Sequence, residues 1–384
     1  MQVIYCSIGN LKCFKENVYL INTTYVIIMK KLTKEKYYDA VYGSWLGRCI
    51  GSRLGAPLEL KPYLWIKKRY GEINNYIKPL KEKYVNDDEM YEIVGLLTLE
   101  RHGIDINSKI IGEEWLRELY TMMFTAEKAA YNNMKKRGIM PPESGKKNIY
   151  YDFIGGQMKG DIWGQIAPCP EIAAHYAKID GEVAHSGDGI LGEIFIAVLI
   201  SLGFFNPNIK ENINEALKYI PVDSNYHRFI KLAINLHSRY SNWRYSLRKL
   251  KGYWRKFKKE LISQSSIKRK TILMTPFSAV HVLPNASIIT ISLLYGNNDF
   301  EKSICIAAMC GFDTDCNCGN VGAILGTICG AQNIPHKWKD PLNDMFYTKT
   351  RSIKEIKISE IAKRVCRIGE KIIQNKCNNI LLID

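Results

Sequence analysis

Two stripes of glycine constrain the fold of this chain more than any other feature. After Thr33, a suitable N-cap, helical periodicity runs to the residue before Pro57 and carries glycines four residues apart, at Gly43, Gly47, Gly51 and Gly55. A glycine inside a helix costs about 1 kcal/mol relative to alanine, so four on one face need a compensating gain such as very close helix contact. A second stripe consists of Gly319, Gly322, Gly326 and Gly330. The sequence therefore predicts two helices that cross with their backbones nearly touching.

The remaining pattern is also helical, and alternating strand-like segments are scarce. We expect one helix over 87–103, one over 112–138, and a fully buried central helix over 190–205. The segments 155–171 and 185–190 are rich in glycine and proline and are expected to be loops. A length of 384 residues with no evident linker favours a single all-α domain over residues 29–384.

Residues 1–28 differ from the rest of the chain, because they lack helical periodicity and the features of a secretory signal. We expect them to be a non-native or disordered extension. The apolar runs stop near a dozen residues, short of the roughly 20 that span a bilayer, so no membrane segment is expected. Eleven cysteines without a CxxC pair favour free thiols in a reducing cytoplasm.

The net charge of +16 favours an acidic partner, such as nucleic acid, a phosphate-bearing substrate or an anionic surface, without choosing among them. The segment 241–264 is densely basic and carries aromatic residues. Its apolar residues step by three and four, which favours a packed helix with a solvated basic face; they are Trp243, Leu247, Leu250, Trp254, Phe257 and Leu261. The alternative, which is not favoured, is that the basic residues of this helix steer an anionic macromolecule such as nucleic acid. These residues are Arg248, Lys249, Arg255, Lys256 and Lys259.

Two acidic clusters are candidates for chemistry. Asp87 and Asp88 are adjacent in NDDEMYE, and Asp313 and Asp315 flank a threonine in GFDTDCN, directly before the second glycine stripe. Each cluster is also explained by helix capping alone. Neighbouring carboxylates repel, however, and a divalent cation would relieve that repulsion. All-oxygen ligands suit Mg²⁺ or Mn²⁺ better than zinc.

Four segments in order and spacing resemble the ADP-ribosylglycohydrolase family over about residues 36–331. They are GSWLGRCIGSRLGAPLE, NDDEMYE, HSGDGILGE and GFDTDCNCGNVGAILG. The resemblance implies an all-α, compact orthogonal helix bundle around a central binuclear metal cleft that holds two Mg²⁺ ions, which Mn²⁺ can replace. It also implies a hydrolase that releases ADP-ribose from an ADP-ribosylated protein or small molecule.

The resemblance places four metal ligands, Asp87, Asp88, Asp313 and Asp315, with Asn86 as a further candidate where the family has threonine. Cys316 also replaces a usual threonine and is a poor ligand for a hard ion. Glu59 follows the family's GAP-type turn and is the candidate for handling the proton, so the catalytic set is Glu59, Asp88 and Asp313.

The resemblance also assigns substrate contacts. The riboses and pyrophosphate are expected at His185, Gly187, Asp188 and Gly189, and the pyrophosphate at Gly156 and Lys159. A structural histidine and a surface lysine are the alternatives for His185 and Lys159. Two other functions stay open: a metal-dependent hydrolase of another ADP-ribose or nucleoside derivative, and a non-catalytic ADP-ribose-binding or structural protein.

Overall fold

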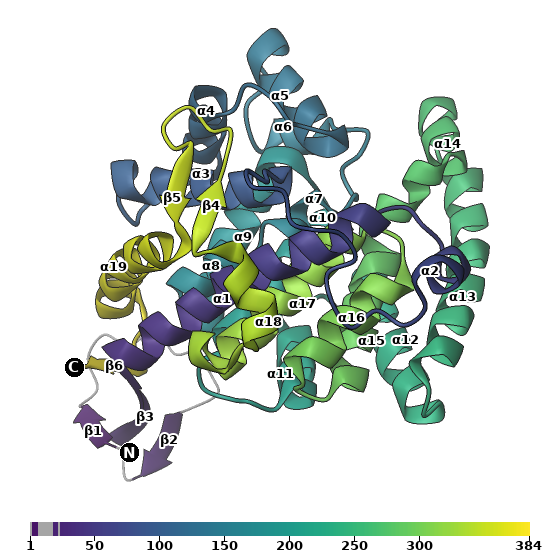
Figure 1. The fold of residues 1–384 in the computed structure, drawn as a ribbon. Helices are drawn as coiled ribbons and strands as arrows, with labels where there is room; N and C mark the ends of the chain where they lie inside the picture. The colour runs from purple at the N-terminus through teal and green to yellow at the C-terminus, as the bar shows by residue number, and fades with distance from the viewer. Residues whose placement is uncertain (1, 7–17, 22–23) are drawn as a thin grey trace.

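Two long helices form the centre of the computed structural model, which describes residues 2–6, 18–21 and 24–384. They are α1 (Lys34–Gly55) and α17 (Thr314–Cys329), which lie side by side (Figure 1). A Cβ atom added to Gly47 would lie 2.0 Å from the carbonyl oxygen of Gly322, and one added to Gly43 would lie 2.3 Å from that of Gly326. The predicted close crossing is confirmed.

Not every glycine of the α1 stripe faces a glycine of α17. Gly51 and Gly55 meet the carbonyls of Cys318 and Thr314, at 2.0 and 2.1 Å from an added Cβ. Gly330 caps the end of α17 with a φ of +76°, a conformation that favours glycine. The start of α1 is as predicted, because the Thr33 side chain accepts a hydrogen bond from the backbone N–H of Lys36 at 3.1 Å.

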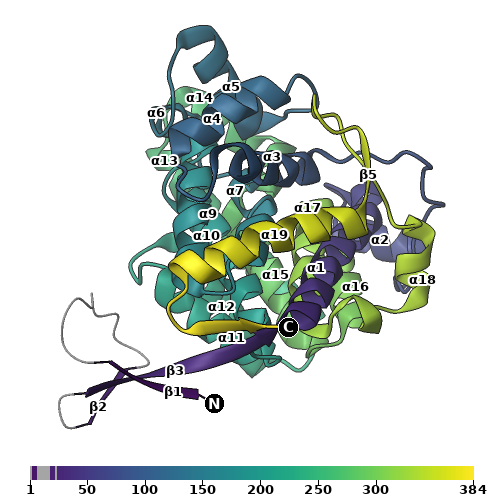
Figure 2. The ribbon, with the colours of Figure 1, turned by 90° about the vertical axis from the view of Figure 1, so that its left-hand side faces the viewer.

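The other helices surround this pair (Figures 1 and 2). Before the central buried helix α10 (Asp188–Gly203) the helices are α2 (Tyr63–Tyr70), α3 (Asp87–His102), α4 (Ser108–Glu118), α5 (Thr125–Arg137), α6 (Glu143–Lys146), α7 (Gly155–Met158), α8 (Asp161–Ile166) and α9 (Pro170–Ala184). After it come α11 (Ile209–Ala216), α12 (Asn225–Arg239), α13 (Trp243–Gln264), α14 (Ile267–Met274), α15 (Val282–Gly296), α16 (Phe300–Cys310), α18 (His336–Lys339) and α19 (Ile358–Lys376). Short 3₁₀ turns occupy Ala56–Leu58, Leu217–Tyr219, Pro276–Val280, Ala331–Asn333 and Asp340–Leu342. The all-α prediction is confirmed, as are the helices expected over 87–103 and 190–205.

Two local predictions are wrong. The helix expected over 112–138 is two helices, α4 and α5, separated at 119–124. The backbone N–H of Arg351 donates to the carbonyl of Glu118 at 3.0 Å, and a continuing helix would need that carbonyl for its own ladder. The expected loop at 155–171 contains α7 and α8, and almost all of its residues are buried.

Strands appear where the sequence pattern predicted none. The strands β1 (Gln2–Cys6) and β2 (Val18–Ile21) pair antiparallel with β3 (Thr24–Thr33), and the last four residues of β3 pair in parallel with β6 (Ile380–Ile383). The two ends of the chain therefore lie together (Figure 2). A hairpin elsewhere joins β4 (Met345–Tyr347) to β5 (Glu355–Lys357). The predicted extension over residues 1–28 falls partly outside the described residues and stays a prediction.

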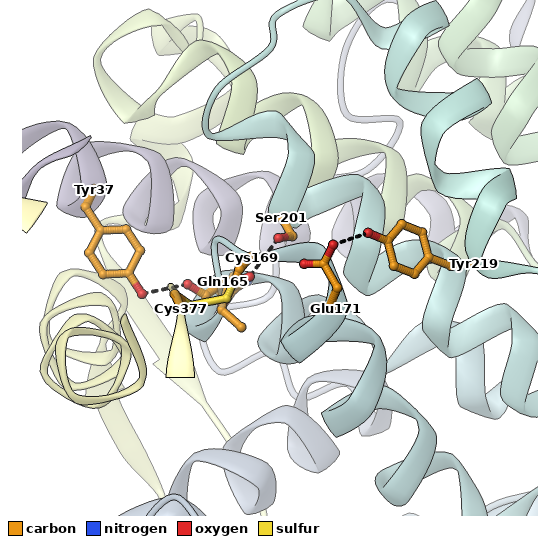
Figure 3. The surroundings of a disulfide bond; sticks show 8 residues. Tyr37, Gln165, Cys169, Glu171, Ser201, Tyr219 and Cys377 are labelled. Atoms are coloured by element: carbon orange, nitrogen blue, oxygen red, sulfur yellow. Dashed lines mark hydrogen bonds between the residues drawn. A yellow bond between two sulfur atoms is a disulfide. The ribbon is translucent and has the colours of Figure 1, made fainter. Parts of the chain in front are cut away.

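A disulfide joins two distant segments. Cys169 directly precedes α9, Cys377 directly follows α19, and the two residues are bonded across a sequence separation of 208 (Figure 3). Beside this bond, Tyr37 of α1 donates to the carbonyl of Gln165 at 2.8 Å. The expectation of free thiols is wrong for this pair, since spacing along the chain gives no sign that the two residues meet. Among the residues that the structure describes, seven further cysteines are free thiols.

The described residues contain no helix that combines the length and the apolar character needed to cross a lipid bilayer.

Candidate active site

The N-terminal turns of two helices bring the predicted acidic residues together. Asp87 and Asp88 lie in the first turn of α3, whereas Asp313 caps α17 and Asp315 lies in its first turn. The Asn86 side-chain amide joins the two turns by donating to Asp315 Oδ2 at 3.3 Å. We call these four aspartates and Glu59, which follows α1, the carboxylate cluster: Glu59, Asp87, Asp88, Asp313 and Asp315.

The end of α1 fixes this junction. The Thr314 hydroxyl donates to the carbonyl of Gly55 at 2.8 Å, and the backbone N–H of Leu60 donates to the carbonyl of Phe312 at 2.8 Å. Both contacts depend on the close helix crossing, because Gly55 has no side chain to separate α1 from Thr314. The glycine stripe thereby places Glu59 beside the aspartates of α17.

The carboxyl groups of the cluster perturb one another. Burial and then the charges of Asp315 and Glu59 raise the pKa of Asp313 well above its ordinary value. Burial and the charges of Asp88 and Asp315 do the same to the pKa of Asp87. Glu59 lies on the exposed rim, where desolvation of its carboxyl and the charge of Asp315 raise its pKa to about 7. The uncompensated negative charge of this cluster favours a bound cation.

The donor set suits a hard divalent cation. Asp315 Oδ1 is buried and has no hydrogen-bond partner, although a buried carboxylate oxygen normally has one. Ligand atoms of Asp313, Asp315 and Cys316 lie within 4.8 Å of one another. Burial raises the pKa of the Cys316 thiol well above its ordinary value, so this group stays neutral beside the carboxylates. The carboxylate oxygens, rather than this sulfur, match Mg²⁺ or Mn²⁺.

Asn86 caps α3 and uses both atoms of its side-chain amide in hydrogen bonds within the protein. Its side-chain oxygen accepts from the backbone N–H of Asp88 at 3.0 Å, which is the N-cap bond of α3, and its amide nitrogen donates to Ser52 Oγ at 2.6 Å. The oxygen that was the candidate ligand is thus already used in this structure.

A buried arginine that the sequence analysis did not identify organises the base of the site. Arg48, in the middle of α1, is fully buried and contacts carboxylates at 3.1 Å on Asp88, 3.2 Å on Glu92 and 3.5 Å on Asp161. A Cβ on Gly319 would lie 2.7 Å from its Nη1 atom, so this glycine makes room for the guanidinium. Arg48 opposes the effect of burial on the pKa of Asp88 and holds that carboxyl in place.

His185 lies in a second buried pair near the cluster. Its Nε2 atom is 3.0 Å from Glu127 Oε1, and its Nδ1 atom is 3.2 Å from the carbonyl oxygen of Tyr151. The charge of Glu127 also contributes to the raised pKa of Asp87, which shows that the pair lies close to the cluster. Glu127 was missed by the sequence analysis. Nothing in the sequence relates it to this site, whereas in the structure an added Cβ on Gly155 would lie 1.7 Å from Glu127 Oε1.

Three further predicted substrate residues, Gly187, Asp188 and Gly189, lie at the start of α10. Gly187 is exposed with a φ of +52°, and Asp188 Oδ1 accepts from the backbone N–H of Tyr226 at 3.0 Å. Gly189 and Gly156 are buried against each other, since a Cβ on Gly156 would lie 2.5 Å from the carbonyl oxygen of Gly189. These two glycines therefore permit the close approach of α7 to α10.

Lys159 does not fit the predicted contact with a pyrophosphate. Its side chain is fully buried, and its ammonium lies 2.6 Å from Glu193 Oε2 and 2.8 Å from Asp180 Oδ2. The Trp163 indole N–H donates to the same two carboxylates at 3.1 and 2.8 Å. Lys159 is thus a member of an internal ion-pair network, with its charge already balanced.

A separate cavity of about 750 Å³ lies beside the N-terminal half of α1, lined in part by Tyr38, Asp39 and Tyr42. The carboxylate cluster is at the other end of this helix, whose last residue, Gly55, lies about 24 Å from Asp39 along the axis at 1.5 Å per residue. The Asp39 carboxylate is already engaged there by the backbone N–H of Gln332 at 3.2 Å. The chemistry of the carboxylate cluster therefore does not extend to this cavity.

Comparisons with known proteins show which family this chain resembles. The model of the ADP-ribosylglycohydrolase family matches residues 33–371, which include the whole carboxylate cluster. An uncharacterized protein of Archaeoglobus fulgidus is 23% identical over 347 residues, covering 87% of this chain and 99% of that protein. A solved structure, an ADP-ribosylglycohydrolase-related protein complex, has the same fold with a TM-score of 0.60 at 15% identity, covering 87% of this chain and 99% of the other. The chain belongs to the ADP-ribosylglycohydrolase family.

Proposed function

We propose that this protein is a Mg²⁺-dependent hydrolase that cleaves a ribosyl glycosidic bond and releases ADP-ribose from an ADP-ribosylated protein or small molecule. The family match supports a glycohydrolase acting on ADP-ribose compounds. The observation that carries the proposal is the convergence of aspartates from α3 and α17, with the buried Oδ1 atom of Asp315 left without a hydrogen-bond partner.

In this proposal Asp87, Asp88, Asp313 and Asp315 hold two Mg²⁺ ions, which Mn²⁺ can replace. When bound, such ions orient the sugar hydroxyls and lower the pKa of a bound water, which supplies a nucleophile at neutral pH. Arg48 and Asn86 orient the ligating carboxylates through their contacts with Asp88 and Asp315. Glu59 is the member of the cluster on the exposed rim, so it is placed to exchange a proton with the departing group or the solvent.

The proposal is tested by measuring ADP-ribose release, by chromatography with mass detection, from conjugates on arginine, serine, acetate and a nucleic acid. We expect release from at least one conjugate with Mg²⁺ and reversible loss of activity with a chelator. Asp313→Asn should abolish turnover without unfolding the chain. Asp39→Asn, at the far end of α1, is the control of equal charge change and should retain activity. Undiminished release in excess chelator, or no release from any conjugate despite bound metal, would refute the proposal.

Glu59→Gln separates proton transfer from metal binding. We expect kcat to fall by about 100-fold, which is typical for loss of a general acid or base, while the affinity for Mn²⁺ stays within about twofold of wild type. A parallel loss of metal affinity would make Glu59 a ligand instead.

A further inference from the structure

Most of the net positive charge of this protein comes from one stretch of chain. Residues 224–298 contain 14 lysines and arginines and a single acidic residue, Glu260. This fifth of the sequence therefore accounts for most of the net charge of +16. It spans α12, α13, α14 and α15, of which α13 and α14 form one side of the molecule (Figure 1).

Helix α13 separates its apolar and basic residues onto two faces. Trp243, Leu247, Leu250 and Trp254 are buried and Phe257 and Leu261 are half-buried, which confirms the predicted apolar seam. The opposite face exposes five cations, Arg248, Lys249, Arg255, Lys256 and Lys259. At 100° and 1.5 Å per residue, these five fall within about 120° of the helix circumference and span about 16 Å. We call this set the basic face.

The charges of the basic face are not neutralised within the protein. Among the residues that the structure describes, cations of α13 and α14 form ion pairs with acidic side chains only at Arg244 and Arg269. An aromatic ring lies on the same face: Tyr245 is 49% exposed, and the Arg248 guanidinium is 5.1 Å from its ring centroid. Exposed cations beside an exposed aromatic ring are the elements of single-stranded nucleic acid binding.

Helix α13 packs beside the segment that leads into α17. Lys251, at the edge of this face, lies over the ring of Phe312 at 5.5 Å, and Phe312 directly precedes Asp313. On the next turn Trp254 packs against His281 with ring centroids 4.9 Å apart. A polyanion held along α13 would thus lie near the N-terminal end of α17, although the aspartates there would by themselves repel it.

We propose that the basic face binds a single-stranded nucleic acid and presents an ADP-ribose group attached to it to the carboxylate cluster. The binding stands on the charge and aromatic arrangement of α13, whereas the presentation rests on the proposed function. A regularly charged phosphate backbone matches several exposed cations on one helix face, and a base can stack on Tyr245. Binding to an anionic membrane would also need exposed apolar residues that insert into the lipid. Such residues, Ile267 and Met274, lie on α14 and not on the basic face.

The experiment compares two variants of the full chain with equal loss of charge. The first, Arg248→Gln/Arg255→Gln/Lys259→Gln, removes three cations that lie in one row along the basic face. The second, Lys363→Gln/Arg367→Gln/Lys371→Gln, removes three exposed cations of α19, of which Lys363 and Arg367 are paired with Glu360 at 4.0 and 2.9 Å. Fluorescence anisotropy measures the Kd of a labelled single-stranded 20-mer at several salt concentrations.

We expect wild type and the α19 variant to bind alike and the α13 variant to bind at least about 10-fold more weakly. The slope of log K against log salt should fall in magnitude by about 2, since each phosphate contact to a single strand contributes about 0.7. Equal weakening by both variants, or no binding by wild type at low salt, would overturn the proposal. Binding of phosphatidylserine vesicles or of a polyglutamate 20-mer as tightly as the oligonucleotide would also overturn it.

A kinetic arm tests the presentation step. For an ADP-ribosylated oligonucleotide we expect kcat/KM of the α13 variant to fall about 10-fold, with kcat/KM for a small ADP-ribosyl conjugate unchanged. An equal effect on both substrates would show that α13 acts through the fold and would overturn the proposal. If wild type hydrolyses neither substrate, the proposed function is refuted. The anisotropy measurements alone would then decide whether the basic face binds nucleic acid.

Discussion

Asp152 shows how this fold keeps a buried charge. Its Oδ2 atom accepts from Arg269 Nη2 and lies 3.2 Å from His281 Nε2. The backbone N–H of Leu283 donates to His281 Nδ1 at 3.3 Å, which leaves Nε2 as the protonated nitrogen facing Asp152. Although burial acts in the opposite direction, these partners hold the pKa of Asp152 well below its ordinary value.

The lowered pKa of Asp152 predicts a pH-dependent contribution to stability. Because the folded pKa lies below the unfolded value of about 3.9, the contribution is full above about pH 5 and is lost as the pH falls toward the folded pKa. We expect Asp152→Asn to lower the free energy of unfolding by about 3 kcal/mol at pH 7, and the difference from wild type to narrow below about pH 4. Urea unfolding of both proteins from pH 7 to pH 3 measures this. A difference that is independent of pH would contradict the assigned pKa direction.

The candidate residues were predictable to different degrees. Asp87, Asp88, Asp313 and Asp315 could be predicted because acidic residues at helix starts form local motifs. Arg48 could not, since a single arginine on a helical pattern gives no sign that its partners come from α3 and α8. The partners of Lys159 were equally hidden, because Asp180 and Glu193 lie on two other helices.

Helix packing in this molecule depends on what a glycine position faces. Gly47 faces the backbone of α17, whereas a Cβ on Gly252 of α13 would meet no atom within 4 Å. The close crossing could be predicted because the stripe repeats every four residues. The break between α4 and α5 could not, since the group that competes for the carbonyl of Glu118 comes from Arg351, far along the chain.

This contrast predicts opposite effects of one substitution. Gly47→Ala should destabilise the protein by about 3 kcal/mol or more, because the new Cβ would lie 2.0 Å from the carbonyl oxygen of Gly322. Gly252→Ala should stabilise it by about 0.5–1 kcal/mol, because alanine favours the helix and nothing obstructs it. Urea unfolding followed by far-UV circular dichroism measures both. Wild-type stability of Gly47→Ala would contradict the close crossing.

At the scale of the whole molecule, the chain ends are tied in two ways. The strands β3 and β6 pair side by side, and the disulfide between Cys169 and Cys377 fixes the end of α19 to the start of α9. Neither link could be predicted, because each joins segments that are far apart in the sequence and have no local motif. The predominance of helices, in contrast, could be predicted from periodicity.

The disulfide closes a long loop and should stabilise the fold by restricting the unfolded chain. We expect Cys169→Ser/Cys377→Ser to lower the free energy of unfolding by about 2–4 kcal/mol, measured as a lower Tm by calorimetry. Dithiothreitol should lower the Tm of wild type and leave that of the double variant unchanged, which serves as the control. An unchanged wild-type Tm in the reducing agent would show that the bond does not contribute.

The central claim is that the aspartates of α3 and α17 together hold divalent cations. Calorimetric titration of the full chain with Mn²⁺ tests it most directly. We predict saturable binding of about two ions per chain in wild type and in Asp39→Asn, with binding lost or reduced to one site in Asp313→Asn. Absence of saturable binding, or the same affinity and stoichiometry in Asp313→Asn as in wild type, would contradict the account.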